Sequence, residues 1–396
     1  MLILNKPQVE KNGNFVIVKA SADDNEKKRE LFFAVESSYE SAIDKSLNPF
    51  VFWALLIAVY EKQDLIIDGP VSKRFLYGIK KLLLPAFEKM NLHKPEIFAN
   101  ELIDDNKDVH VASGCATGLS GGIDSFCTVV DNINNDELKL THLVQFFDNN
   151  SINDLAEGLG FLREEDEKLN KFNDELSKKF NLPVVKVYSN FTEHIKFNFG
   201  QIHVYCHVSD AMLLNGIVGK YLYASGYYID KTCLDFSATS HYELLVCQVV
   251  NRPDFELISY QPAFSRIDKT LNIADDKIVQ QYLTTCLKRE IGEGNCTVDC
   301  FKCMRTTITL DIIGKLDNFK DVYDIQLYHK NRARIWGDTF YRAYFMYDPF
   351  AKEILAYIKE HNIKKPFGTS FYMISKGLDN QLLKFKRRLK LGDKAQ

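Results

Sequence analysis

The sequence contains no hydrophobic run long enough to cross a membrane. Its longest apolar stretch, Pro49 to Tyr60, is shorter than the roughly 20 residues that a transmembrane helix needs. The first residues, MLILNKPQVEKNG, also lack the cationic flank, apolar core and cleavage site of a secretory signal. We therefore expect a cytoplasmic protein with no membrane partner.

The chain also lacks an excess of positive charge. It has 50 Lys and Arg against 53 Asp and Glu, so no overall field attracts phosphate backbones or anionic membranes. Hydrophobic residues make up 46% and charged residues 26%, close to the averages of folded proteins, which excludes a largely disordered chain. A length of 396 residues predicts two or three domains.

No internal repeat, low-complexity tract or flexible linker marks a domain boundary, so boundaries come from changes in pattern. Residues 1–108 mix short β-rich runs with apolar segments of helical length, which predicts a small α+β domain. Residues 109–317 alternate between strand and helix patterns, which predicts a doubly wound parallel sheet with helices on both faces. Residues 318–396 predict a helical C-terminal extension.

The elements predicted in the central domain follow one another at short intervals. They are a strand at Cys115–Leu119, a helix at Phe126–Ile133, strands at Thr141–Phe147 and Val184–Tyr188, a long helix at His203–Tyr223 and a β-rich run at Tyr227–Leu234. In the first domain, Phe50–Tyr60 predicts a helix. This order fits an α/β fold.

A glycine-rich loop, Ser120-Gly121-Gly122-Ile123-Asp124-Ser125, follows the first of these strands. Consecutive glycines let the backbone turn sharply and approach a ligand, and a helix N-terminus directs unpaired N–H groups at an anion. The two serine hydroxyls can donate to phosphate oxygens, and Asp124 can ligate magnesium or orient the loop amides. The pattern therefore predicts a phosphate-binding loop, and the alternative is a tight turn with a helix cap.

Motifs of other nucleotide and metal enzymes are missing. The sequence has no GxxxxGK[ST], which argues against kinase-type ATPases, and it has no GxGxxG or HExxH. These absences leave the SGGxDS loop as the main nucleotide-binding candidate.

Four of the nine cysteines fall within one short segment with the spacing C-x9-C-x3-C-x2-C: Cys286, Cys296, Cys300 and Cys303. Thiolates that converge from a short loop containing glycines are typical of a closed tetrahedral zinc site. Three alternatives stay open: separately buried thiols, a redox-active Cys-x-x-Cys pair and an iron–sulfur cluster. We predict zinc.

The SGGxDS loop resembles the pyrophosphate-binding loop of the N-type ATP pyrophosphatase, or PP-loop, superfamily. The run Cys300-Phe301-Lys302-Cys303-Met304-Arg305 ends the cysteine segment in a way similar to the 7-cyano-7-deazaguanine synthase family of queuosine biosynthesis. The resemblance covers roughly residues 110–312 and implies an adenine nucleotide alpha hydrolase-like, Rossmann-like domain. The family's Tyr-Pro-Asp-Cys-Arg segment is absent, and Ser237–Glu243 stands in its place.

The resemblance implies that the loop binds the phosphates of ATP together with magnesium, and that a substrate oxygen attacks the α phosphate. Ammonia, an amine or sulfur then displaces AMP. We therefore expect a ligase that activates a carboxylate as an adenylate, acting on a small carboxylate or deazapurine. The segments outside the resemblance suggest a macromolecular acceptor, nucleic acid or protein, and a homodimer.

Other residues complete the predicted site. Arg266 and Lys269 are cations suited to the charge that develops at the α phosphate, and His241 and Glu243 are candidates for substrate binding. Ordinary solvated or capping roles are the alternatives. Two other functions stay open: a tRNA-modifying thiolase or lysidine-type enzyme, favoured by the basic C-terminal segment, and a non-catalytic module that senses ATP.

Overall fold

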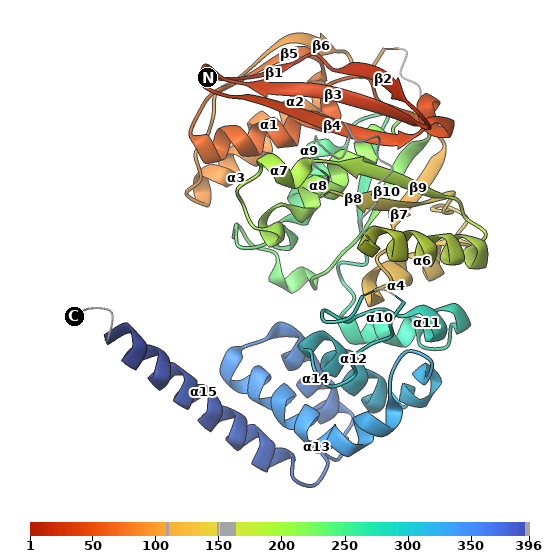
Figure 1. The fold of residues 1–396 in the computed structure, drawn as a ribbon, viewed down its shortest axis with the longest axis vertical. Coiled ribbons are helices and arrows are strands. Elements are labelled where there is room, and N and C mark those ends of the chain that lie inside the picture. The colour runs from red at the N-terminus through yellow and green to blue at the C-terminus, as the bar shows by residue number, and fades with distance from the viewer. Residues whose placement is uncertain (108–110, 149, 151–163, 291, 393–396) are drawn as a thin grey trace. The chain divides into compact units, whose positions relative to one another are not determined.

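The structure, a computed structural model, describes residues 1–107, 111–148, 150, 164–290 and 292–392 (Figure 1). The chain divides into two compact units. Unit 1 comprises Met1–Ser120 and Thr128–Ala263, and unit 2 comprises Gly121–Cys127 and Phe264–Gln396.

Unit 1 is built on one sheet that contains eleven strands among the described residues. The order is β11-β10-β7-β8-β9-β4-β3-β1-β5-β6, and β2 pairs with β3. The bounds are β1 Leu2–Asn5, β2 Gln8–Asn12, β3 Phe15–Asp23, β4 Lys28–Glu36, β5 Leu65–Ser72, β6 Ile97–Ile103, β7 Gly114–Gly118, β8 His142–Phe147, β9 Val184–Ser189, β10 Val218–Ala224 and β11 Glu256–Tyr260.

The five strands β9, β8, β7, β10 and β11 pair parallel to one another, and β1, β5 and β6 form a second parallel group. The prediction of an α/β protein with a mostly parallel sheet is therefore confirmed. Successive residues at the centre of this sheet are buried on both faces, as in β7 from Gly114 to Thr117. Such burial is expected where helices cover both sides of parallel strands.

The first hundred residues contribute strands to this same sheet. β3 and β4 form an antiparallel hairpin, and β4 then pairs antiparallel with β9 through Phe33 and Ser189 and through Ala34 and Tyr188. Strands from residues 1–107 and from the residues after 110 therefore share one sheet, although the sequence suggested a domain boundary near 108.

The main helices of unit 1 pack on this sheet and against one another. They are α1 Asn48–Glu61, α2 Lys73–Gly78, α3 Leu84–Lys89, α6 Glu164–Phe180, α7 Phe191–His194, α8 Phe199–Leu213 and α9 Glu243–Val250, while α4 Ile123–Asn132 continues into unit 1. The apolar run of α1 is buried on nearly every side, with Trp53 stacked on Phe33 of β4 at 4.7 Å between ring centroids. This confirms the predicted helix at Phe50–Tyr60.

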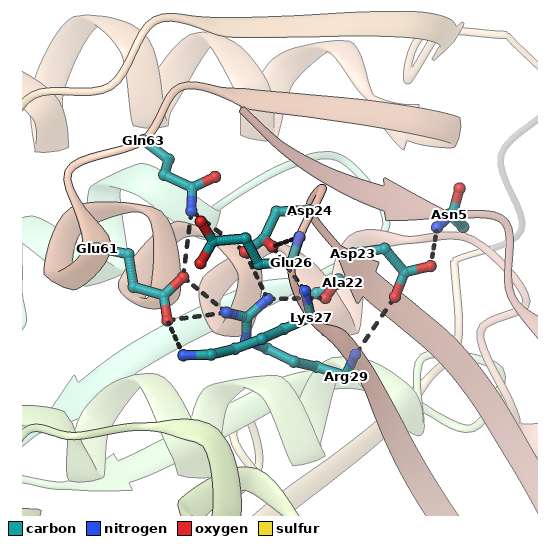
Figure 2. A network of polar contacts seen from close by, with 9 residues as sticks. All are labelled: Asn5, Ala22, Asp23, Asp24, Glu26, Lys27, Arg29, Glu61 and Gln63. Carbon is teal, nitrogen blue, oxygen red and sulfur yellow. Dashed lines mark hydrogen bonds and ion pairs between the residues drawn. The ribbon is translucent and has the colours of Figure 1, made fainter.

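A polar network ties the β3–β4 hairpin to the end of α1 (Figure 2). Arg29 on β4 donates to both carboxylate oxygens of Glu61, at 2.8 and 2.7 Å, and to Asp24 at 3.0 Å. Gln63 donates to Asp24 and Glu61, at 3.2 and 3.4 Å. The Arg29 side chain is almost completely buried, and the carboxylates of Asp24 and Glu61 offset the free-energy cost of removing its charge from water.

Unit 2 consists of helices among its described residues (Figure 1). They are α10 Arg266–Ile273, α11 Lys277–Tyr282, α12 Phe301–Ile312, α13 Ile325–Tyr341, α14 Pro349–Glu360 and α15 Thr369–Gly392, with the first turn of α4. Asp311 of α12 accepts hydrogen bonds from Tyr328 at 2.6 Å and from Arg332 at 2.7 Å, both on α13. The residues predicted as a C-terminal extension, 318–396, are helical where the structure describes them, and they belong to a unit that already begins at Phe264.

Two predicted elements are wrong. The helix expected at His203–Tyr223 ends at Leu213, and its second half is strand β10. Gly216 lies between the two elements. A side chain at this position would collide with the backbone oxygen of Ser41, which explains the glycine. The β-rich run Tyr227–Leu234 forms a short 3-10 turn, and Ile229 donates to the backbone oxygen of Pro262. β11 takes the sheet position beside β10.

Candidate functional site

The SGGxDS loop lies between strand β7 and helix α4, as the sequence predicts. Gly121 has a φ of +74°, a left-handed conformation that side-chain-bearing residues rarely adopt, and α4 begins two residues later at Ile123. Ser125 is buried and donates to the backbone oxygen of Gly122 at 3.1 Å. The loop therefore has the tight turn and helix start that bring backbone N–H groups together at an anion site.

Asp124 lies beside the two cations that the sequence singled out. Its Oδ2 is 2.9 Å from Arg266 Nη2, and its Oδ1 is 3.6 Å from Lys269 Nζ. Both cations belong to α10, one turn apart, and Lys269 is almost completely buried. The structure thus brings Asp124, Arg266 and Lys269 together within unit 2.

Two further cations, Lys302 and Arg305 on α12, interact electrostatically with the same carboxylate. Burial and the charge of Arg266 lower the pKa of Arg305 to about 10, and Asp124 acts in the opposite direction. Burial and the neighbouring arginines also lower the pKa of Lys302. In the described part of the chain, neither Lys302 nor Arg305 has an ion-pair partner within 4 Å. Partly buried cations of this kind favour the binding of an anion.

An aromatic ring supports this group of cations. The guanidinium carbon of Arg305 lies 4.0 Å from the centre of the Phe350 ring, and that of Arg266 lies 5.2 Å from it. Cation–π contacts lower the free energy of cations that have lost water. The Phe350 ring therefore stabilises both guanidinium groups, and that of Arg266 also contacts Asp124.

In the sequence, Lys302 and Arg305 stand out only as part of the cysteine motif. Their spacing of three residues on a helix that begins after Cys300 puts them on neighbouring positions of one face. That spacing was a usable signal. The proximity of these two cations to Asp124 could not be predicted, because it depends on the packing of segments about 180 residues apart in the chain.

The four predicted metal ligands converge. The sulfur atoms of Cys286, Cys296, Cys300 and Cys303 all lie within 4.8 Å of one another, and three of the four residues are buried. A tetrahedron of thiolates around one ion is the usual structural zinc site. The cluster can therefore hold zinc, as the sequence predicts.

The loop around the cysteines is organised by Asn295. Its Oδ1 accepts the N–H groups of Thr285 and Cys286, at 2.8 and 3.0 Å, and its Nδ2 donates to the backbone oxygens of Leu283 and Val322. These bonds bring the two ends of the loop together. The left-handed φ angles of its glycines, such as +90° at Gly292, allow the tight return of the chain.

The electrostatics of the cluster fit a cation. Burial raises the pKa of Cys303 well above that of a free thiol, so a thiolate there needs a neighbouring positive charge. At Cys286 burial also raises the pKa, but the backbone N–H groups of Lys288 and Cys296 outweigh it and lower the value to about 7. A bound metal ion would supply the missing charge for all four sulfurs.

The cysteine cluster also positions part of the cationic group. Cys300 caps the N-terminus of α12, where its sulfur accepts the N–H of Cys303 at 3.4 Å. Lys302 and Arg305 follow on the first turns of the same helix. A metal at the cluster would therefore fix the helix that presents these two cations.

The predicted substrate-binding residues His241 and Glu243 lie in unit 1, in different surroundings. His241 Nδ1 is 3.6 Å from the sulfur of Cys233, an exposed cysteine that no motif in the sequence marks, and its Nε2 is 3.9 Å from Asp235. Glu243 is buried at the start of α9 and accepts the hydroxyl of Ser259 at 2.7 Å. His241 is thus the more accessible of the two.

The remaining thiol near the loop is buried. Cys127 is inaccessible to solvent, and Asn272 donates to its sulfur at 3.4 Å. Such burial indicates that Cys127 has a packing role. The side chains of the basic C-terminal residues Lys384 to Lys390 lie outside the described residues.

No family model matches the chain, and neither a curated protein nor a solved structure matches it significantly. Among the described residues, no helix is both long and apolar enough to span a membrane. The proposal below therefore depends on the geometry of the loop, the cations around Asp124 and the cysteine cluster.

Proposed function

We propose that this protein is an ATP-dependent, adenylate-forming ligase of the PP-loop type. The observation that carries the proposal is the contact of Asp124 with Arg266 and Lys269 at a glycine turn that begins a helix, with Lys302 and Arg305 near enough to interact electrostatically with the same carboxylate. A polyphosphate needs this combination of backbone donors and fixed positive charge.

The order of the parallel strands supports a nucleotide-binding role. β7 has β8 on one side and β10 on the other, so the chain proceeds first to one half of the sheet and later to the other. In doubly wound folds ligands bind beyond the carboxyl ends of the strands at such a switch point. The loop Ser120–Gly122 leaves the carboxyl end of β7. We take this order as support for a Rossmann-like nucleotide-binding fold.

Each cation has a role in the proposed reaction. The phosphates of ATP replace Asp124 as the partner of Arg266 and Lys269, while Lys302 and Arg305 receive the charge that builds up on the α phosphate and the departing pyrophosphate. Asp124 would then be the residue that holds a magnesium ion, which would add positive charge beside the phosphates. A carboxylate of the substrate attacks the α phosphate, and an amine or ammonia then displaces AMP.

We propose the chemical class of the substrate and of the acceptor, not a particular compound. By its resemblance to 7-cyano-7-deazaguanine synthases, the substrate is a small carboxylate, such as a carboxylated deazapurine, and a larger acceptor would supply the amine. His241, which lies on the segment that replaces the family's substrate stretch, is the residue we assign to substrate binding.

The test is the identity of the products. Full-length protein is incubated with magnesium, ATP labelled at the α phosphate and a panel of carboxylates with ammonia. AMP with pyrophosphate supports the proposal, and ADP with phosphate as the sole products would refute it. Arg305→Met should remove most of this activity, whereas Lys320→Met, at an exposed cation of the same unit, should not.

A non-catalytic ATP sensor and an RNA-modifying enzyme are separate outcomes. Tight ATP binding without turnover of any carboxylate would indicate the sensor. Affinity for tRNA that falls steeply between two salt concentrations would indicate the RNA enzyme.

A further inference from the structure

A second group of metal-ligand side chains lies in unit 1, away from the four cysteines. The carboxylates of Asp148 and Asp210 and the sulfur of Cys206 lie within 4.8 Å of one another. Asp148 directly follows β8, and the other two residues are four positions apart on α8. Residues at that spacing share one face of a helix, so the fold brings all three groups to the carboxyl end of β8.

Asp210 is the member of this group that most needs a partner. It has no exposed surface, and within the described part of the chain neither of its carboxylate oxygens accepts a hydrogen bond. Its neighbour Asp148 is also an acid, so the two can bond to each other only through a shared proton. A buried carboxylate with no donor and no cation carries a large desolvation penalty unless it takes up a proton or a metal ion.

The second ligand, Cys206, is equally buried. Within the described part of the chain, no lysine or arginine forms an ion pair with Asp148 or Asp210. Titratable groups that interact with these acids include the imidazole of His207, which stacks on Phe146, and the phenol of Tyr221. With all three ligands ionised, the group would hold three negative charges.

Asp148 is held in place independently of the other two. Its Oδ1 accepts the hydroxyl of Ser189 at 2.8 Å, and its backbone oxygen accepts the hydroxyl of Thr192 at 2.7 Å. These contacts come from the end of β9 and the start of α7, so the carboxylate is oriented before any ligand arrives. Preorganised ligands are a feature of functional metal sites.

We propose that Asp148, Cys206 and Asp210 form a second metal site, which binds a divalent transition-metal ion of the zinc class. A thiolate beside two carboxylates selects zinc or its neighbours over magnesium and calcium, which prefer oxygen ligands alone. Three protein ligands leave one position for water or a small ligand, as in catalytic zinc sites. This inference goes beyond the proposed function, in which zinc occurs only at the four cysteines.

The experiment is a measurement of zinc content. Full-length protein is loaded with excess zinc, freed of loosely bound metal and analysed, and about two ions per chain are expected. Asp210→Asn and Cys206→Ser should each lower the content to about one, and Cys303→Ser should independently remove the other ion. The control is Cys247→Ser, which alters another buried thiol of unit 1 and should keep both ions.

The competing explanation is a proton shared between the two carboxyl groups. In that case the wild-type chain binds about one zinc ion, and Asp210→Asn leaves that content unchanged. A chelator titration of the unmodified chain decides the question without any substitution. Release of zinc in two steps supports the site, and a single step of one ion overturns it. Both measurements are independent of ATP turnover.

Discussion

Arg266 Nη2 lies 2.9 Å from Asp124 Oδ2. The first residue belongs to the C-terminal helices and the second to the glycine loop, and the two segments are far apart in the sequence. A carboxylate that neutralises an arginine and a lysine in the absence of a ligand keeps them close together until an anion replaces it. Asp124 therefore has two tasks, the alignment of the cations and, in our proposal, the binding of magnesium.

Replacing Asp124 by asparagine tests both tasks. The variant should lose at least ~100-fold in the rate of ATP cleavage, because the amide neither ligates magnesium well nor aligns the cations. Its circular dichroism should match that of the wild type, since the side chain volume is preserved. Asp317→Asn, at an exposed acid of unit 2, is the control. Turnover near the wild-type rate in the Asp124 variant would remove this residue from the mechanism.

Replacing Cys303 by serine should lower both zinc content and thermal stability. The sulfur is buried, and the metal's contribution to folding of such a loop is several kcal/mol. ATP binding should weaken as well, because α12 carries Lys302 and Arg305. Elemental analysis, a melting curve and a nucleotide titration make the three measurements.

The matched control for this variant is Cys127→Ser, at a buried thiol of the glycine loop's helix. It should keep its zinc. An active, stable preparation without metal, or one that contains iron, would contradict the zinc assignment and favour the redox or iron–sulfur alternatives.

The pH dependence of stability should contain a contribution from His203. Burial and the neighbouring His207 lower its pKa from 6.5 to about 4, so the folded protein keeps this imidazole neutral. Its Nδ1 faces the backbone oxygen of Gly200 at 3.1 Å and Nε2 lies 3.1 Å from the hydroxyl of Ser240, a neutral pattern in which Nδ1 donates and Nε2 accepts.

The direction in which stability changes with pH follows from proton uptake by His203. Between pH 6.5 and 4 the unfolded chain binds a proton at this histidine and the folded chain does not, so the stabilisation is present above pH 6.5 and is lost as pH falls towards 4. The loss is at most about 1.4 kcal/mol per pH unit. Urea melts at several pH values should show a shallower decline for His203→Gln. Parallel curves for the two proteins would contradict the assignment.

The pair Arg29–Glu61 should couple strongly in a double-mutant cycle. Both Glu61 oxygens accept from a guanidinium that is nearly inaccessible to water, so either alanine substitution should lower the free energy of unfolding by roughly 3–5 kcal/mol. The double variant should lose less than the sum. The more exposed pair Lys19–Glu10, at 2.6 Å, should couple by less than about 1 kcal/mol. Equal coupling in the two pairs would contradict the role given to burial.

Local patterns accounted for what the sequence predicted well. The glycine loop and the cysteine spacing are each written in a few consecutive residues, so the turn at Gly121 and the convergence of the four sulfurs follow from local chain geometry. The parallel sheet follows from the alternation of strands and helices.

The misses have physical reasons. The run from His203 to Tyr223 is mostly apolar and mostly buried, and such a run shows no clear period that separates a helix from a strand. The group of Asp148, Cys206 and Asp210 is assembled from residues about sixty positions apart. No spacing rule connects them, because tertiary packing alone sets their distance.

The pairing of β4 with β9 has a consequence for how the chain folds during synthesis. β4 leaves the ribosome with one edge satisfied by β3, and its partner β9 is translated roughly 150 residues later, a delay on the order of ten seconds. During that interval a strand containing Leu31, Phe32 and Phe33 presents an open, apolar edge. Nascent chains of this protein should therefore be clients of ribosome-associated chaperones until β9 arrives.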